Sequence, residues 1–283
     1  MPTLHLAHSP DADDAFMFFA LAEGRIDTED RQYVHELADI ETLNQRALRG
    51  ELDITAVSFH AYAYLADTYA LLPSGGSVGD RYGPRLVAKY AAPTNLRNAL
   101  RGLRVAIPGP LTTATLVLRL YQAEFEPVPT PFDQIEDRVA AGEVDAGLLI
   151  HEGQLTYRSR GLHLWLDLGE WWHAETGLPL PLGGNVVKRG LGDAVIRGVA
   201  RDLRASIAYG LQHRAQALQH ALHYARGLDA PQADEFVGMY VNDYTLDYGE
   251  RGRRAVEELL ARAASAGIIP APIRPVFASA APS

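Results

Sequence analysis

One stretch, DAGLLIHEGQLTY at residues 145–157, constrains the fold more than any other. Its apolar residues from Ala146 to Ile150 have the length and bulk of a strand buried on both faces, which is typical of a parallel sheet covered by helices. The run ends on His151, and the residues from Glu152 onward suit a helical turn or a tight loop. Open α/β sheets place their ligand crevice at the carboxyl ends of such strands. An imidazole there can exchange a proton near neutral pH, although a structural histidine or a helix N-cap fits the same position.

The order of predicted elements indicates two lobes. Strand, polar turn and helix alternate in the first part of the chain, and the same pattern restarts after an interruption. Extended segments near residues 86–92 and 180–188 are expected to cross between the two sets. We therefore predict an α/β protein with a central cleft, one lobe formed by residues 1–88 plus 188–283 and the other by residues 89–187.

Polar clusters end predicted strands in both halves of the chain, at Ser9–Asp14, Ser58 with His60, Thr112-Thr113 and His151-Glu152. Clusters from both halves can converge only in a cleft between lobes. Hydroxyls and backbone N–H groups at helix starts suit a carboxylate, so a small anionic molecule is the expected partner. Taken singly, Ser9 or Thr112 is more often a simple helix cap than a ligand contact, and it is the four strand ends together that favour a ligand site.

Composition narrows the classes of partner. The net charge of −9 argues against nucleic acid, since no basic patch offsets it. The chain has no cysteine, which excludes disulfides and thiolate chemistry. It shows neither a secretory leader nor an apolar run of about 18–20 residues, so a cytoplasmic protein that does not cross a membrane is expected. A homodimer through the C-terminal helices stays open.

Metal sites are not expected. Asp11, Asp13 and Asp14 lack the spacing of a calcium loop. His220 and His223 share a helix face but have no third ligand nearby in the sequence. The adjacent pair Trp171 and Trp172 cannot face the same side of a helix, so we expect one in the core and the other lining the cleft.

Several segments together resemble a known family. They are SPDADDAF at 9–16, TAVSFHAY at 55–62, Pro108-Gly109 with Thr112-Thr113, GLLIHE at 147–152, DLGEWW at 167–172 and TGLPLPLG at 176–183. The chain resembles the 1,4-dihydroxy-6-naphthoate synthases of the futalosine route to menaquinone. This resemblance implies a fold similar to type II periplasmic binding proteins and an intracellular lyase that acts on cyclic dehypoxanthinyl futalosine with no metal or organic cofactor.

The resemblance also implies roles for particular residues. His151 would be the proton-accepting base. In the mechanism that we expect from this role, the imidazole is neutral and is oriented by Glu152 or a backbone carbonyl. Substrate would be bound by Ala56, Val57, Ser58, Thr112 and Thr113, and Asp14 would belong to the cleft wall. Some members of the family carry Asn in place of Asp13 and Lys in place of Ala56. Two other functions fit the same fold: a chorismate dehydratase of the same pathway, and a non-catalytic binding protein for a small carboxylate.

Overall fold

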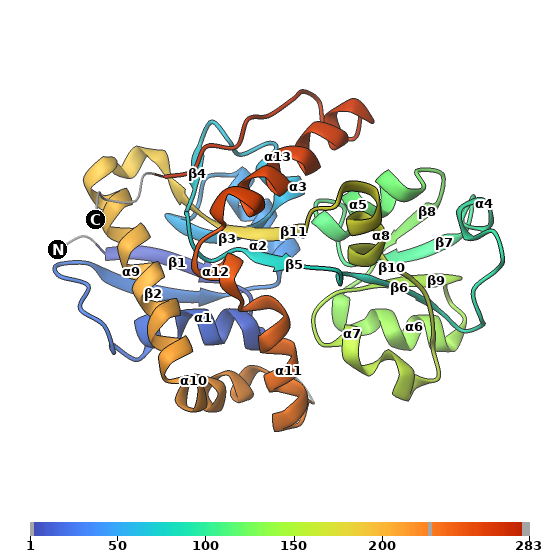
Figure 1. Cartoon of the computed structure of the whole chain (residues 1–283), viewed down its shortest axis with the longest axis horizontal. Helices are drawn as coiled ribbons and strands as arrows, with labels where there is room; N and C mark the ends of the chain where they lie inside the picture. The colour runs from blue at the N-terminus through green and yellow to red at the C-terminus, as the bar shows by residue number, and fades with distance from the viewer. Residues whose placement is uncertain (1–2, 226–227, 279–283) are drawn as a thin grey trace.

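Two mixed β-sheets organise the chain, which a computed structural model describes over residues 3–225 and 228–278 (Figure 1). The first sheet has the order β2-β1-β3-β11-β4, and β5 pairs with the far end of β11. Strands β1, β2 and β3 are parallel, whereas β11 runs antiparallel to its neighbours. The bounds are β1 (Thr3–His8), β2 (Gln32–Leu37), β3 (Ile54–Ser58), β4 (Tyr69–Leu71), β5 (Ser77–Gly79) and β11 (Leu180–Lys188).

The second sheet has the order β10-β6-β9-β7-β8. Its strands are β6 (Arg85–Ala88), β7 (Arg104–Ile107), β8 (Glu126–Pro129), β9 (Ala146–Leu149) and β10 (His163–Asp167). We call the part of the chain built on the first sheet lobe 1 and the part built on the second sheet lobe 2. In Figure 1 the two lobes lie side by side along the longest axis.

Helices cover both sheets. Lobe 1 carries α1 (Ala12–Ala22), α2 (Ile40–Leu48), α3 (Phe59–Tyr62), α9 (Asp193–Gln212), α10 (Arg214–Ala221), α11 (Ala230–Tyr240), α12 (Asp243–Leu246) and α13 (Gly249–Ser265). Lobe 2 carries α4 (Leu96–Ala99), α5 (Thr113–Tyr121), α6 (Ile135–Ala141), α7 (Gly153–Thr156) and α8 (Leu168–Thr176). Short 3₁₀ turns lie at Phe132–Gln134, Tyr157–Arg160, Arg189–Leu191 and Leu222–Tyr224.

The predicted strand before His151 is present as β9, and all four of its residues are buried. It pairs in parallel with β7 and antiparallel with β6, so the sheet around it is mixed rather than wholly parallel. Gly147 lies under α6, where an added Cβ would come within 2.6 Å of Ile135 and Val139 side chains. A glycine at this position therefore lets the helix pack closely onto the strand.

The extended crossings lie elsewhere than the sequence suggested. The segment near residues 86–92 was expected to be a connector, but Arg85–Ala88 forms β6 inside the second sheet. The segment 180–188 is β11, a strand of the first sheet. The strand pairing therefore assigns residues 85–88 to lobe 2 and residues 180–187 to lobe 1. Short apolar runs carry no sign of the sheet they join, because antiparallel partners come from distant parts of the chain.

One apolar core runs through both lobes on the side of α13. Its buried residues include Phe59 of α3, Leu116 of α5 and Leu259 of α13. A second core, around the deeply buried α1, has its buried residues in lobe 1 and is closed by α9, α10 and α11, and Leu155 of α7 in lobe 2 packs against its edge. The lobes are thus held together along one side, and the opposite side is left for a cleft.

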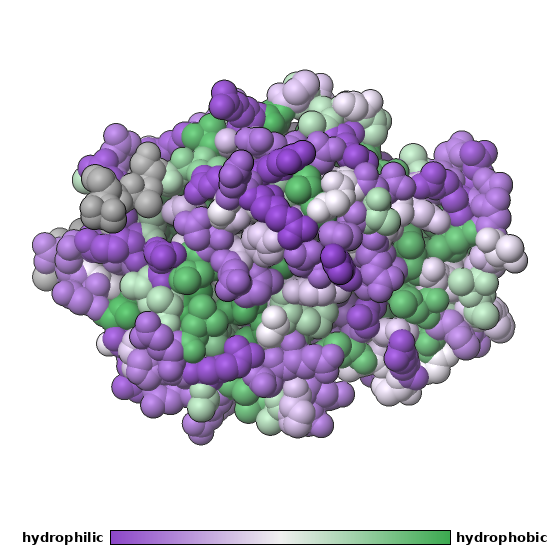
Figure 2. Space-filling model, viewed as in Figure 1, coloured by the Kyte–Doolittle hydropathy of each residue, from purple (hydrophilic) through white to green (hydrophobic). Residues whose placement is uncertain are grey.

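The molecular surface on the face shown in Figure 2 is mostly hydrophilic, with hydrophobic residues in small, separate areas. Among the described residues, no helix combines the length and apolar character that crossing a membrane would require.

Candidate active site

A cleft of about 730 Å³, including the open space at its mouth, lies between the lobes. All seven residues that the family resemblance singled out line it: His151, Ala56, Val57, Ser58, Thr112, Thr113 and Asp14. Its other walls include Ser9 and Asp11 from the β1–α1 turn, Asp13 from the first turn of α1, and Asn185, Gln154 and Tyr240. The ends of β1, β3 and β9 therefore meet in one place, as the polar strand ends predicted.

His151 projects from the turn after β9 with a left-handed backbone, at φ +54°. Such a conformation is uncommon for a residue with a side chain and costs of order 1–3 kcal/mol. The N-cap position of α7 belongs to Glu152, so His151 is not the helix cap that its sequence position allowed. Instead, its Nδ1 lies 2.9 Å from Oδ2 of Asp11 across the cleft.

Asp11 is the residue that orients the imidazole. Its side chain is buried, and its Oδ2 also accepts a hydrogen bond from the Ser9 hydroxyl. The expectation that Glu152 or a backbone carbonyl orients His151 is therefore wrong for this structure. With Nδ1–H donated to Asp11, the second ring nitrogen is left for a molecule in the cleft. This Nε2 is buried and has no hydrogen-bond partner among the residues described.

The surroundings of His151 pull its pKa in two directions. Burial lowers the pKa, but the charge of Asp11 and its hydrogen bond, with smaller contributions from Glu152 and Asp13, raise it to about 9. A pKa of about 9 favours the protonated imidazole at neutral pH. For His151 to act as the expected neutral base, it must therefore release this proton before it can accept another.

Three further carboxyl groups lie close to this pair. Burial, with the charge of Asp11, raises the pKa of Asp13 to about 6 and that of Glu152 to about 7. Burial and the charges of Asp13 and Asp11 hold the pKa of Asp14 well above its usual value. Asp14 accepts a hydrogen bond of 2.8 Å from the Ser9 backbone N–H. The end of the cleft around His151 is therefore rich in carboxyl groups, which disfavour binding of an anionic group there.

The hydroxyls expected to bind substrate are engaged within the protein. The Thr112 hydroxyl donates to the Gly109 carbonyl at 2.9 Å and accepts the Thr115 N–H at 3.3 Å, which caps α5. Thr113 donates to the Leu182 carbonyl. Both the hydroxyl and the N–H of Ser58 are bonded to the Asn44 side chain. At the α5 end of the cleft, the groups that remain for an anion are the backbone N–H groups of Thr113 and Ala114 in the first turn of the helix. N–H groups in a first helical turn have no acceptor within the helix.

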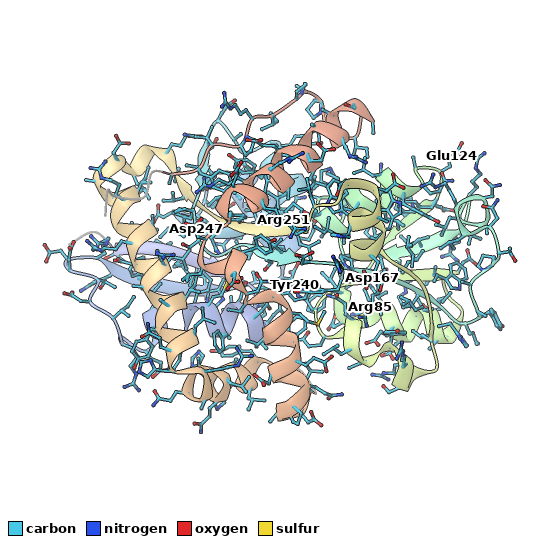
Figure 3. The ribbon with its side chains drawn as sticks, viewed as in Figure 1. Arg85, Glu124, Asp167, Tyr240, Asp247 and Arg251 are labelled. Atoms are coloured by element: carbon cyan, nitrogen blue, oxygen red, sulfur yellow. The ribbon has the colours of Figure 1, made fainter. Side chains whose placement is uncertain are left out.

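Sequence reasoning missed several cleft residues. Asn185 is buried, its Nδ2 donates to the Gly75 carbonyl at 2.9 Å, and its Oδ1 has no partner in the described ranges. Tyr240 of α11 lies 2.7 Å from the Gln154 side-chain amide, which brings α11 of lobe 1 onto lobe 2. Figure 3 shows Tyr240 at the junction of the lobes. The signal for Asn185 was present, because it is the single amide in the run from 180 to 188.

Two other expectations concern the adjacent tryptophans and a metal site. Trp172 is fully buried in the core, as expected for one of the two tryptophans. Trp171 packs on Tyr121 in a surface groove of lobe 2 and does not line the cleft, which corrects the second half of that expectation. Within the described part of the chain, no group of three His, Asp or Glu residues is placed to hold a metal ion.

The two lobes, the double crossing and the cleft define a periplasmic-binding-protein-like fold. The alkanesulfonate-binding protein of Xanthomonas axonopodis superimposes with a TM-score of 0.70 over 96% of each chain, at 14% identity, which is a likeness of fold alone. A crystal structure of a protein from Archaeoglobus fulgidus is more similar, with a TM-score of 0.90 and 47% identity over 94% of this chain and 98% of that one.

The sequence identifies the family. A model of the menaquinone biosynthesis family matches residues 4–265. The protein of Thermus thermophilus named 1,4-dihydroxy-6-naphthoate synthase is 44% identical over 277 residues, which are 98% of this chain and 100% of that protein. The chain belongs to the menaquinone biosynthesis family, among enzymes of that pathway, and the predicted resemblance to these synthases is confirmed.

Proposed function

We propose that this protein is a cofactor-independent lyase that converts cyclic dehypoxanthinyl futalosine to 1,4-dihydroxy-6-naphthoate. The observation that carries the proposal is the His151–Asp11 pair in the cleft between the lobes. The chain that holds this pair is 44% identical to a protein named as such a synthase. An oriented imidazole with one ring nitrogen unpaired suits removal of a proton from carbon. The mostly apolar walls of the cleft, with Ile40, Phe236 and Leu182 among them, suit a ring system.

Charge sets the orientation of the substrate in this proposal. The acidic residues around His151 disfavour the substrate carboxylate at that end of the cleft. The first turn of α5 offers backbone N–H groups and the positive end of the helix dipole. The carboxylate therefore lies against Thr113 and Ala114, and the sugar-derived part of the spiro ring system lies against His151.

The reaction begins once His151 has lost its own proton. Nε2 then takes a proton from the sugar-derived part of the substrate, and the electron pair of the broken C–H bond forms a new double bond. The bond from the adjacent carbon to the departing group breaks, its electron pair leaves with that group, and the departing group takes the proton back from the imidazolium. The following eliminations are drawn forward by formation of the aromatic naphthoate. Asp11 stabilises the imidazolium that forms.

The first experiment is to incubate the purified, metal-free protein with cyclic dehypoxanthinyl futalosine and to follow the naphthoate by absorbance and mass spectrometry. His151→Ala is expected to lower turnover by about 10²–10⁴-fold, the usual contribution of a positioned base. His163→Ala, an exposed histidine at the start of β10, serves as the matched control and should keep wild-type turnover.

Two outcomes would overturn the proposal. Conversion of chorismate rather than the futalosine derivative would assign the dehydratase activity instead. Tight binding of unchanged substrate, with no product from wild type, would assign a binding protein. Near-normal turnover by His151→Ala would leave the activity but remove His151 from its role.

A further inference from the structure

We infer that the base of this enzyme is assembled only when the two lobes close, because Asp11 in lobe 1 is the positioning residue for His151 in lobe 2. The inference rests on the proposed function. It adds to that function a residue that acts through His151, and a step in which cleft closure prepares the base.

The two side chains come from opposite walls of the cleft. Asp11 is the N-cap residue of α1, in the turn after β1 of the first sheet. His151 follows β9 of the second sheet. Their 2.9 Å contact therefore exists only while the cleft is narrow. Any movement that widens the cleft by a few ångströms separates a carboxylate from the imidazole that it orients.

Other contacts show that this structure has the closed arrangement. The Leu111 N–H donates to Glu41 of α2 at 3.1 Å, and the Thr113 hydroxyl accepts the His60 N–H at 3.3 Å. On the α11 side, the hydroxyl of Tyr240 in lobe 1 lies 2.7 Å from the side-chain amide of Gln154 in lobe 2. Opening the cleft separates Tyr240 from Gln154 and Leu111 from Glu41 together with the Asp11–His151 pair, whereas α3 and α5 stay joined through the core that both lobes share.

Loss of Asp11 changes the chemistry of His151 in two ways. The hydrogen bond from Nδ1–H fixes which nitrogen remains for the substrate, so without it the neutral ring can place its proton on either nitrogen. The ring also loses the hydrogen bond that fixes its position. It then keeps its T-shaped contact with Phe132, at 4.8 Å between the ring centroids. The charged groups that face His151 are Asp11, Asp13, Asp14 and Glu152. Of these, Asp11 alone has a hydrogen bond to the ring in the described structure.

Steady-state kinetics of Asp11→Asn and Asp11→Ala test the positioning role. We expect kcat to fall by about 10²-fold or more, the lower end of what a positioned base contributes, whereas KM changes less than about threefold. The pH midpoint of kcat/KM should move to lower pH in Asp11→Asn, because the neighbouring negative charge is gone.

Asp229→Asn is the matched control, since it removes one carboxylate from the N-cap of α11 and leaves a residue that caps equally well. It should keep the wild-type kcat and pH profile. An Asp11→Asn enzyme with wild-type kcat and an unmoved pH midpoint would overturn the inference. A wild type that makes no naphthoate would instead overturn the proposed function, so the two failures are distinct.

Closure itself is measurable because the chain has no cysteine. Spin labels on Leu48→Cys in lobe 1 and Tyr90→Cys in lobe 2, both exposed positions, report the distance between the lobes. With the product 1,4-dihydroxy-6-naphthoate as probe, we expect the short-distance population to grow and the ¹⁵N signals of His151 to shift in parallel. His151 signals that stay constant while the lobes close would overturn the assembly step.

Discussion

The protonation of His151 gives a prediction at the scale of single residues. A base must be neutral, and the pKa of His151 is raised to about 9 against the lowering effect of burial, chiefly by Asp11. Below that pH each unit of increase multiplies the neutral fraction about tenfold, so kcat/KM should rise from pH 7 toward a midpoint near 9. A profile measured from pH 6 to 10 checks this. Activity that falls over the same range would mean that His151 donates a proton rather than accepting one.

Asp13 carries a second residue-scale prediction, which concerns stability. Its folded-state pKa of about 6 lies above the ordinary value of 3.8, chiefly because of burial, so the unfolded chain releases the proton first as pH rises. The carboxyl therefore weakens the fold progressively between those two values and by a constant amount above pH 6.

We expect Asp13→Asn to unfold at higher urea concentration at pH 8, with a gain of roughly 1–3 kcal/mol in the free energy of unfolding. The gain should vanish below about pH 3.8, where both states are protonated. An equal gain at both pH values would contradict the electrostatic explanation.

The α5 helix carries a prediction at the scale of elements. Because the Thr112 hydroxyl caps this helix, Thr112→Ala should lower the free energy of unfolding by about 1 kcal/mol. Thr112→Ser keeps a hydroxyl and should lose much less. Urea unfolding distinguishes the two. A large rise in KM for Thr112→Ala with no loss of stability would mean that the hydroxyl binds substrate after all.

The turn before α5 approaches lobe 1 closely. A Cβ added at Gly109 would come within 2.8 Å of the Cβ of Glu41 in α2, so Gly109→Ala pushes these elements apart. We expect a folded protein with a less populated closed form and a KM raised roughly tenfold, since apparent affinity scales with the competent fraction. Gly190→Ala, where an added Cβ meets nothing within 4 Å, is the control. Equal KM values for the two variants would show that this contact does not limit closure.

The elements also show how far the sequence could lead. His151 was predictable because an apolar run ends in an imidazole, and the periodicity of α5 and α9 is plain in the chain. The sheets that the extended segments β6 and β11 join could not be predicted, because their partner strands are not adjacent in sequence. The Asp11–His151 contact could not be predicted, since it depends on the distance between two lobes. The left-handed backbone of His151 could not be predicted, because histidine adopts this conformation more often than most residues but still only rarely.

At the scale of the whole molecule, the two-lobed fold follows from the repeated strand and helix pattern, and its family is now established. The homodimer and the cytoplasmic location remain predictions. Sedimentation of the purified protein with and without 1,4-dihydroxy-6-naphthoate would settle the first and would show whether ligand binding alters it.

The crossings between the lobes have a consequence for how this protein evolves. Strands β5 and β11 are paired where the chain leaves lobe 1 and where it returns, with Val78 opposite Pro181. Lobe 2 is therefore an insert whose two ends are neighbours in space, so a recombination with one junction near each end exchanges it whole. His151 and the first turn of α5, both in lobe 2, would be inherited together. Asp11 would stay behind in the recipient, so a chimera of two homologues is active only if the donated histidine meets a compatible aspartate.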